Sequence, residues 1–223
     1  MAARRSARVP AFTVIIPARM RSTRLPGKML ADLAGVPMVA RVAERAAQSG
    51  ATQVVIATDH ARIARAVSAL GWRVCMTSPR HATGTDRLAE AAAQLGLGER
   101  EIVVNVQGDE PLIAPALVAQ VAGELARRRA ASIATAAHPI ASARAFFDPN
   151  VVKVVLDAAG CATYFSRAPI PYARDAFLAG RRRLPAGFPA LRHIGIYAYR
   201  AGYLRSFGAL APTQAERFEA LEQ

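Results

Sequence analysis

Two side chains that could hold a metal ion follow directly on a strongly apolar segment of the chain. Asp109 and Glu110 come after the run 102–107, in the tetrapeptide Gly-Asp-Glu-Pro. A short apolar run of this kind is typical of a buried strand, so both carboxylates are expected where the strand leaves its sheet. Carboxylate oxygens are preferred ligands of Mg²⁺. The sequence therefore predicts a divalent-metal site at this strand end.

A second segment is suited to binding phosphate. It follows the apolar run 12–16 and carries four cations within ten residues, Arg19, Arg21, Arg24 and Lys28. Guanidinium forks and ammonium groups both bind phosphate oxygens. Lys28 is one of only two lysines in the chain, the other being Lys153. We therefore expect side chains of this loop to wrap a triphosphate, and a merely solvated basic loop is the alternative.

Further polar residues follow the next strand-like runs. Thr58 and Asp59 stand at the end of one run, and the segment 80–87 follows another. Asp59 is expected either to contact a ligand or to cap the helix that follows it. Residues 83–86, Thr-Gly-Thr-Asp, are expected either to begin a helix or to offer amides and hydroxyls that read a pyrimidine edge.

The order of the elements predicts an α/β fold with a mostly parallel central sheet. Between the strand-like runs lie segments with helical periodicity, for which the spacing of Ile63, Val67 and Leu70 is an example. In such sheets ligands bind beyond the carboxyl ends of the strands, where these polar loops fall. Neither GxxxxGK[ST] nor GxGxxG after the first strand is present, which argues against a P-loop ATPase or a dinucleotide dehydrogenase. The strand-like runs are 12–16, 54–58, 73–76 and 102–106.

Length and composition indicate one globular domain. The chain has 223 residues, of which 52% are hydrophobic and 20% charged, and no linker-like tract divides it. We expect a single domain over 1–223 with a disordered tail at 1–11. No apolar stretch approaches the roughly 20 residues of a membrane span, so we expect a cytoplasmic protein without membrane partners. Cys75 and Cys161 are expected to be buried bystanders.

The net charge of +13 is compatible with nucleic-acid binding, because a basic surface attracts a polyanion. The charge is scattered, however. The triplets 127–129 and 181–183 are not interleaved with aromatic residues, as a single-strand platform would be. We therefore expect no nucleic-acid partner.

Several motifs in sequence order resemble one enzyme family. They are RMRSTRLPGK (19–28), ATDH (57–60), ATGTDR (82–87), VNVQGDEP (104–111), YFSR (164–167), RHIGIY (192–197) and LEQ (221–223). The chain thereby resembles the 3-deoxy-manno-octulosonate cytidylyltransferases, or CMP-Kdo synthetases, from about residue 12 to its last residue. The resemblance implies a three-layer Rossmann-like nucleotide-diphospho-sugar transferase fold. It also implies a CTP-binding half at 12–130 and a half at 131–223 that binds sugar and forms a homodimer. Independently of the resemblance, the runs 151–157 and 161–167, joined by Ala158-Ala159-Gly160, predict a β-hairpin in the second half.

The activity implied by the resemblance is transfer of CMP from CTP to 3-deoxy-manno-octulosonate (Kdo), with release of pyrophosphate, for lipopolysaccharide biosynthesis. Asp109 would hold Mg²⁺ at the α-phosphate, and Arg19 and Lys28 would stabilise the departing pyrophosphate. The implied nucleotide-binding residues are Arg19, Lys28, Thr58, Asp59, Arg80, Thr83, Gly84 and Thr85. The implied sugar-binding residues are Arg24, Gln107, Arg167, His193, Tyr197, Glu222 and Gln223. Without the resemblance, His193 and Tyr197 would be interpreted as structural core residues and Glu222 as a solvated one.

The chain also departs from this family's pattern. Members continue beyond the position of Gln223 with a strand and helix that bear a Gly-x-Asp-Thr-Pro motif, whose aspartate is the second metal ligand. With Asp109 alone we expect weaker Mg²⁺ binding. Three alternatives therefore stand beside the Kdo enzyme: a cytidylyltransferase for another sugar acid such as sialic acid, an inactive remnant that binds CTP, and a basic nucleic-acid binder.

Overall fold

The computed structural model describes residues 10–20, 25–81, 83–180, 183–207, 210–211 and 213–221. The chain folds into two compact units. Unit 1 comprises Met1–Ala134 and Ile196–Leu210, and unit 2 comprises Thr135–Gly195 and Ala211–Gln223. The predicted halves met at residue 130, whereas here residues 196–210 return to the first unit.

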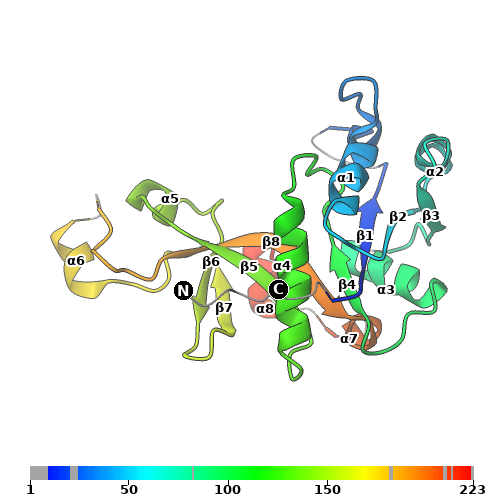
Figure 1. The fold of residues 1–223 in the computed structure, drawn as a ribbon. Helices are drawn as coiled ribbons and strands as arrows, with labels where there is room; N and C mark the ends of the chain where they lie inside the picture. The colour runs from blue at the N-terminus through cyan, green and yellow to red at the C-terminus, as the bar shows by residue number, and fades with distance from the viewer. Residues whose placement is uncertain are drawn as a thin grey trace, which may run out of the picture. The chain divides into compact units, whose positions relative to one another are not determined.

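Unit 1 is built on a mixed sheet in which most strands are parallel (Figure 1). Strand β1 (Phe12–Ala18) pairs in parallel with β2 (Gln53–Thr58) and with β4 (Ile102–Asn105). Strand β3 (Arg73–Met76) extends the sheet in parallel beyond β2, and the second half of β8 (Leu191–Arg200) pairs antiparallel with β4. The four predicted parallel strands are confirmed within two residues at each end.

Helices cover both faces of this sheet, because alternate strand residues point to opposite sides. On one face Ile15, Val55 and Val103 form a core with Leu88 and Leu204. On the other face the intervening residues are equally buried, and helices α1 and α4 contact the strands and each other. The three-layer α/β class predicted from sequence is thereby confirmed. The helices of unit 1 are α1 (Met38–Ala47), α2 (Ala61–Ser68), α3 (Gly84–Gln94), α4 (Pro115–Arg127) and α7 (Ala201–Phe207), with a 3₁₀ turn η1 (Lys28–Leu30).

Unit 2 contains the predicted β-hairpin. Strands β6 (Lys153–Leu156) and β7 (Ala162–Ser166) pair antiparallel, and β6 also meets the first half of β8. The carboxylate of Asp157 fixes the turn by accepting hydrogen bonds from the amides of Ala159 (2.9 Å) and Cys161 (2.7 Å). Strand β5 (Ile133–Pro139), which begins in unit 1, pairs with β8, and helices α5 (Ala143–Phe147), α6 (Arg174–Ala179) and α8 (Gln214–Glu219) complete the unit.

A small aromatic core stabilises the part of unit 2 around α5 and α6. Phe146 and Phe177 are buried there, and their rings lie edge to face on Phe188, with centroids 5.3 and 5.6 Å from it. Helix α6 lies within 169–189, a segment rich in Pro and Arg for which the sequence predicted no helix. The prediction for Cys161 was also wrong, because this thiol is exposed at the hairpin turn, whereas Cys75 is buried as expected.

None of the helices in the part of the chain that the structure describes is long and apolar enough to cross a lipid bilayer.

Candidate active site

The loops after β1 and β4 are joined by an ion pair between Lys28 and Asp109. The ammonium group donates to the Oδ2 atom of Asp109, although 81 residues separate the two in sequence. Both side chains remain accessible, with 23% of Lys28 and 39% of Asp109 exposed. Gly27, with φ of 72°, provides the left-handed backbone from which η1 starts at Lys28. The structure thus brings together the predicted phosphate-binding lysine and the predicted metal-binding aspartate.

The loop that carries Asp109 packs so closely on its neighbours that only glycine fits at its first position. A Cβ atom on Gly108 would lie 2.9 Å from both the carbonyl oxygen of Pro17 and the Sδ atom of Met29. The backbone carbonyl cannot move without shifting the end of β1. Gly108 therefore allows the close packing that fixes the position of Asp109 relative to the end of β1.

The N-terminus of α3 reaches the same end of β1. A Cβ atom on Gly84 would lie 3.9 Å from Cγ of Pro17. The Oγ1 atom of Thr83 accepts a hydrogen bond from the amide of Asp86 (3.1 Å), and the Asp86 carboxylate accepts one from the amide of Thr83 (3.0 Å). This capping box confirms that 83–86 begins a helix. Because a helix N-terminus carries partial positive charge, this position also favours an anion.

Asp59 does not cap α2. The N-cap is His60, whose Nδ1 atom accepts a hydrogen bond from the amide of Arg62 (3.2 Å). The carboxylate of Asp59 instead forms an ion pair with the guanidinium of Arg87 (3.0 Å), which also donates to the hydroxyl of Thr77. Of the two alternatives left open for Asp59, helix capping is therefore wrong.

The other nucleotide-binding candidates of unit 1 lie near these loops in different environments. Thr58 is fully buried, pairs with Ala18 across β1 and β2, and accepts a hydrogen bond from the amide of His60 (3.2 Å). Arg19 follows β1 directly and is partly buried, Thr85 is buried in the first turn of α3, and Arg80 is exposed. The resemblance implies base recognition by these loops, in which the side chains of Asp59 and Thr83 are partly buried.

Two sugar-binding candidates also belong to unit 1. Gln107 is partly buried between β4 and Gly108. Tyr197 pairs with Asn105 across β4 and β8, and its ring stacks on Tyr199 with centroids 5.8 Å apart. Tyr199 belongs to the buried core, so the packing role expected for Tyr197 without the resemblance is present too.

Sequence reasoning missed two buried polar residues beside this site. Arg87 is fully buried, and among the described residues its Nε atom has no hydrogen-bond partner. Asn105 is 4% exposed, and its Oδ1 atom likewise has no partner within the described part of the chain. Arg87 lies in the motif 82–87 and Asn105 in the motif 104–111. What could have indicated them in the sequence is a polar residue within an otherwise apolar strand or helix face.

Glu110, the second carboxylate of the Gly-Asp-Glu-Pro segment, is partly buried. Burial, and secondly the charge of Asp109, raises the pKa of Glu110 above its usual value. In the ranges that the structure describes, no three His, Cys, Asp or Glu side chains gather as a ready metal site. Mg²⁺ in nucleotide enzymes commonly uses one or two carboxylates together with substrate phosphates and water. Asp109, accessible and paired with Lys28, the predicted phosphate-binding lysine, fits that kind of site.

The sugar-binding candidates of unit 2 are both held by the protein itself. His193 is buried, its Nε2 atom lies 2.9 Å from Oγ1 of Thr135, and its ring packs edge-on against Phe165. Burial lowers the pKa of His193 to about 4, so the imidazole is neutral near pH 7. The guanidinium of Arg167 donates to the backbone carbonyls of Pro149 (2.9 Å) and Glu219 (2.5 Å).

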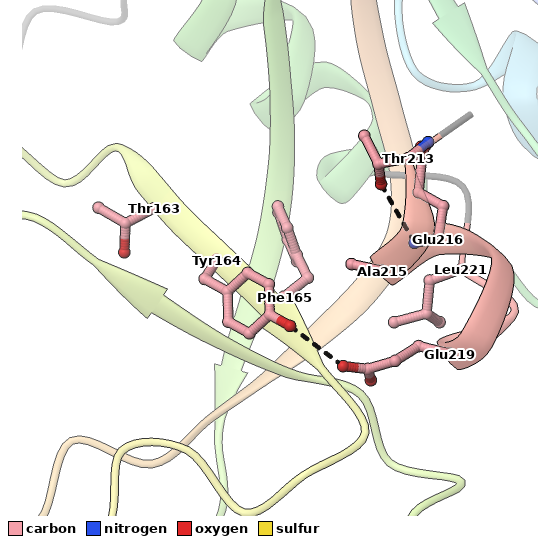
Figure 2. A pocket seen from close by; sticks show the side chains of 8 residues that line it. All are labelled: Thr163, Tyr164, Phe165, Thr213, Ala215, Glu216, Glu219 and Leu221. Carbon is pink, nitrogen blue, oxygen red and sulfur yellow. Dashed lines mark hydrogen bonds between the residues drawn. The ribbon is translucent and has the colours of Figure 1, made fainter. Parts of the chain in front are cut away.

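A cavity of about 280 Å³ lies within unit 2, between β7 and α8 (Figure 2). Thr163, Tyr164 and Phe165 line one side, and Glu216 and Glu219 line the other. None of the sugar-binding candidates described in this unit lines it. Arg24, Glu222 and Gln223 lie outside the described residues, as do residues 1–9 of the predicted tail.

Comparisons with known proteins show which family this sequence resembles. A sequence model of the family described as cytidylyltransferase matches residues 13–223. The chain is 59% identical over 220 residues to a 3-deoxy-manno-octulosonate cytidylyltransferase of Verminephrobacter eiseniae (strain EF01-2), which covers 95% of this chain and 81% of that one. It is 58% identical over 222 residues to the enzyme of the same name from Acidovorax sp. (strain JS42), covering 97% and 85%.

A solved structure gives the same result for the fold. A CMP:2-keto-3-deoxy-manno-octonic acid synthetase, determined in complex with CTP, superposes with a TM-score of 0.84 at 40% identity. The match covers 95% of this chain and 83% of that one. The loops that meet around Pro17 thus lie in a chain whose fold and sequence are both those of nucleotidyltransferases. This chain belongs to the cytidylyltransferase family.

Proposed function

We propose that this chain transfers CMP from CTP to Kdo and releases pyrophosphate. The observation that carries the proposal is the Lys28–Asp109 ion pair, which sets a phosphate-binding cation and a metal-binding carboxylate side by side beyond the carboxyl ends of β1 and β4. The relatives' names identify the nucleotide and the sugar acid.

The reaction needs orientation and charge neutralisation more than covalent chemistry, as other phosphoryl transfers do. Lys28 and Arg19 bind the β- and γ-phosphates and stabilise the charge that develops on the departing pyrophosphate. The amides at the N-terminus of α3 and the loop around Asp59 recognise the cytidine. Because Asp109 and Lys28 neutralise each other in the ion pair, a phosphate that takes Lys28 also makes the carboxylate available.

Asp109 is the residue that would hold Mg²⁺. When bound, the ion neutralises phosphate charge and makes the attacking hydroxyl of the sugar more acidic near neutral pH. Glu110 is not needed as a ligand in this proposal, since burial keeps its pKa raised.

The sugar-acid ligands that the family resemblance implies are Gln107 and Tyr197 in unit 1, Arg167 and His193 in unit 2, and Arg24, Glu222 and Gln223. A neutral His193 can donate or accept one hydrogen bond to a hydroxyl without attracting the carboxylate. The family resemblance adds three expectations: a homodimer, a cytoplasmic location and a product used for lipopolysaccharide biosynthesis.

The test is pyrophosphate release from CTP with and without Kdo, in Mg²⁺ and after chelation by EDTA. The variants are Asp109→Asn and, as a matched control, Asp175→Asn, whose carboxylate on α6 is 94% exposed. We expect Kdo-dependent release that EDTA abolishes, that Asp109→Asn lowers at least 100-fold and that Asp175→Asn leaves unchanged. Sialic acid, supplied in competition, should not replace Kdo.

The other outcomes distinguish the alternatives. Release with sialic acid but not Kdo would identify another sugar-acid cytidylyltransferase. CTP binding without release would indicate a nucleotide-binding protein without turnover. Absence of CTP binding to the parent chain would refute the nucleotide site itself.

A further inference from the structure

Residues 77–81 form a loop that leads from β3 toward α3 in unit 1. The loop carries Arg80, one of the nucleotide-binding residues that the family resemblance implies. Arg80 is exposed, and its guanidinium forms no hydrogen bond or ion pair with any residue that the structure describes. The side chain is therefore available to an anion, and its position depends on the backbone of the loop.

One carboxylate holds this loop on both sides of Arg80. Glu90 lies on α3, and its Oε2 atom contacts both the amide of Ser78 (2.8 Å) and the Nε2 atom of His81. Within the loop, the hydroxyl of Ser78 accepts a hydrogen bond from the amide of Arg80 (3.2 Å). The backbone before Arg80 and the side chain after it are thus fixed to the same oxygen atom.

The charge of Glu90 strengthens both contacts. Burial raises the pKa of Glu90, but the hydrogen bonds from the Ser78 amide and from His81 outweigh burial and hold the pKa below its usual value. The carboxylate is therefore ionised at neutral pH. Because an ionised carboxylate can only accept hydrogen bonds, the Nε2 atom of His81 is the donor. Hydrogen bonds to a charged acceptor are stronger than those between neutral groups.

Neighbouring side chains of α3 hold the start of the same loop. Gln94 donates from Nε2 to Oε1 of Glu90 (2.9 Å) and to the carbonyl oxygen of Met76 at the end of β3 (2.9 Å). One turn earlier, Arg87 donates to the hydroxyl of Thr77. Positions 87, 90 and 94 share one face of α3, because they are three and four residues apart. This face therefore orders the chain from the last residue of β3 to the end of the loop.

We propose that Glu90 is a positioning residue for the nucleotide, which fixes loop 77–81 so that Arg80 is held beside the carboxyl ends of β1, β2 and β3. This inference rests on the proposed function for the identity of the nucleotide. The side chains of Glu90 and His81 are 30% and 22% exposed, and an ion pair that water reaches contributes little to stability. Removing Glu90 should therefore weaken CTP binding more than it destabilises the fold.

The experiment measures the Kd for CTP by isothermal titration calorimetry, with Mg²⁺ and without Kdo. The variants are Glu90→Ala, Glu90→Gln and, as a matched control, Glu44→Ala, which removes a carboxylate paired with Arg41 on α1. We expect Glu90→Ala to weaken CTP binding about 10-fold, because the loop loses an anchor on each side of Arg80. Glu90→Gln should weaken it less, since its amide oxygen can still accept from the Ser78 amide. Glu44→Ala should leave the Kd within about twofold of the parent value.

The variant Arg80→Ala shows whether Glu90 acts through Arg80. Once this guanidinium is absent its position no longer matters, so adding Glu90→Ala should change the Kd by no more than about twofold. The same loss of affinity in both backgrounds would overturn the inference, and so would a parent-like Kd in Glu90→Ala. In the pyrophosphate assay, Glu90→Ala should leave KM for Kdo within about twofold of the parent value. An equal rise in KM for both substrates would indicate general damage and contradict the positioning role.

Amide hydrogen exchange without CTP tests the loop itself. The amides of Ser78 and Arg80 should exchange faster in Glu90→Ala than in the parent, and at the parent rate in Glu44→Ala, while β1 and β4 stay protected in all three proteins. Parent-like exchange of the loop in Glu90→Ala would overturn the inference. If the parent chain does not bind CTP, the proposed function has failed, and exchange alone decides whether Glu90 holds loop 77–81.

Discussion

His193 is a histidine that burial keeps from taking up a proton. Its pKa is lowered from 6.5 to about 4 by burial in unit 2. Between these values the unfolded chain binds a proton at this position and the folded chain does not. The free energy of unfolding therefore falls as the pH drops from 6.5 to 4, by up to about 1.4 kcal/mol per pH unit. Below pH 4 both states are protonated, and this contribution no longer changes.

The measurement is urea unfolding, followed by circular dichroism, of the parent and His193→Gln at pH 7, 6 and 5. The variant should be less stable at pH 7 because it loses packing on Phe165, but its stability should fall less steeply with pH. His138→Gln, at an exposed position, should keep the parent slope. Equal slopes for the parent and His193→Gln would contradict the assignment.

At the scale of single residues, the site residues that could be predicted from the sequence are charged side chains that follow the end of a strand. Lys28 and Asp109 were predicted because a rare lysine and an acidic pair followed apolar runs. Arg87 and Glu90 were not, because their partners Asp59 and Ser78 lie 28 and 12 residues away. An arginine and a glutamate in a helix become informative only when folding brings the partner close.

At the scale of elements, Arg87 links three of them in unit 1. It lies on α3 and binds Asp59, which follows β2, and Thr77, which follows β3. Arg87→Met would leave the Asp59 carboxylate without its counter-charge. We expect the free energy of unfolding to fall by about 3 kcal/mol, the lower end of the range for breaking a buried ion pair, because the Asp59 carboxylate is about one-fifth exposed.

A double-mutant cycle measured by urea unfolding checks this link. The double variant Arg87→Met/Asp59→Leu should recover part of the stability lost in Arg87→Met, because it leaves no unpaired charge in the protein interior. Arg87→Lys should be intermediate, since an ammonium cannot reproduce the fork that reaches two acceptors. Arg62→Met, exposed on α2, is the control, and an Arg87→Met protein as stable as this control would refute the role.

The elements themselves were predictable to different degrees. Strands β1 to β4 were found because continuous apolar runs between helical segments have few other interpretations. The hairpin was found from its Ala-Ala-Gly turn between two apolar runs. Helix α6 was missed because its six residues lie between Pro- and Arg-rich flanks, and it depends on the contact of Phe177 with aromatic residues distant in sequence.

At the scale of the whole molecule, the chain carries a net charge of +13. Several of its arginines form short-range ion pairs with carboxylates. Arg127 and Arg128 at the end of α4 both pair with Glu124, and Arg41 pairs with Glu44 on α1. Such pairs compensate part of the local field, and salt screens exposed charges more than about 10 Å apart. An overall excess of cations is therefore not equivalent to a continuous basic groove.

This distribution predicts how the chain behaves toward nucleic acid. A labelled 20-nucleotide DNA should bind at about 50 mM salt, because the net charge attracts any polyanion. Since few cations contact phosphates at once, the logarithm of the affinity should fall with the logarithm of salt concentration by a slope no steeper than about −3. Fluorescence anisotropy measures this slope, and a CTP titration in the same cell tests competition. A slope of about −6 or steeper, unaffected by CTP, would show a dedicated nucleic-acid surface, because only a continuous row of cations displaces that many counterions together. That result would contradict the expectation that the chain has no nucleic-acid partner.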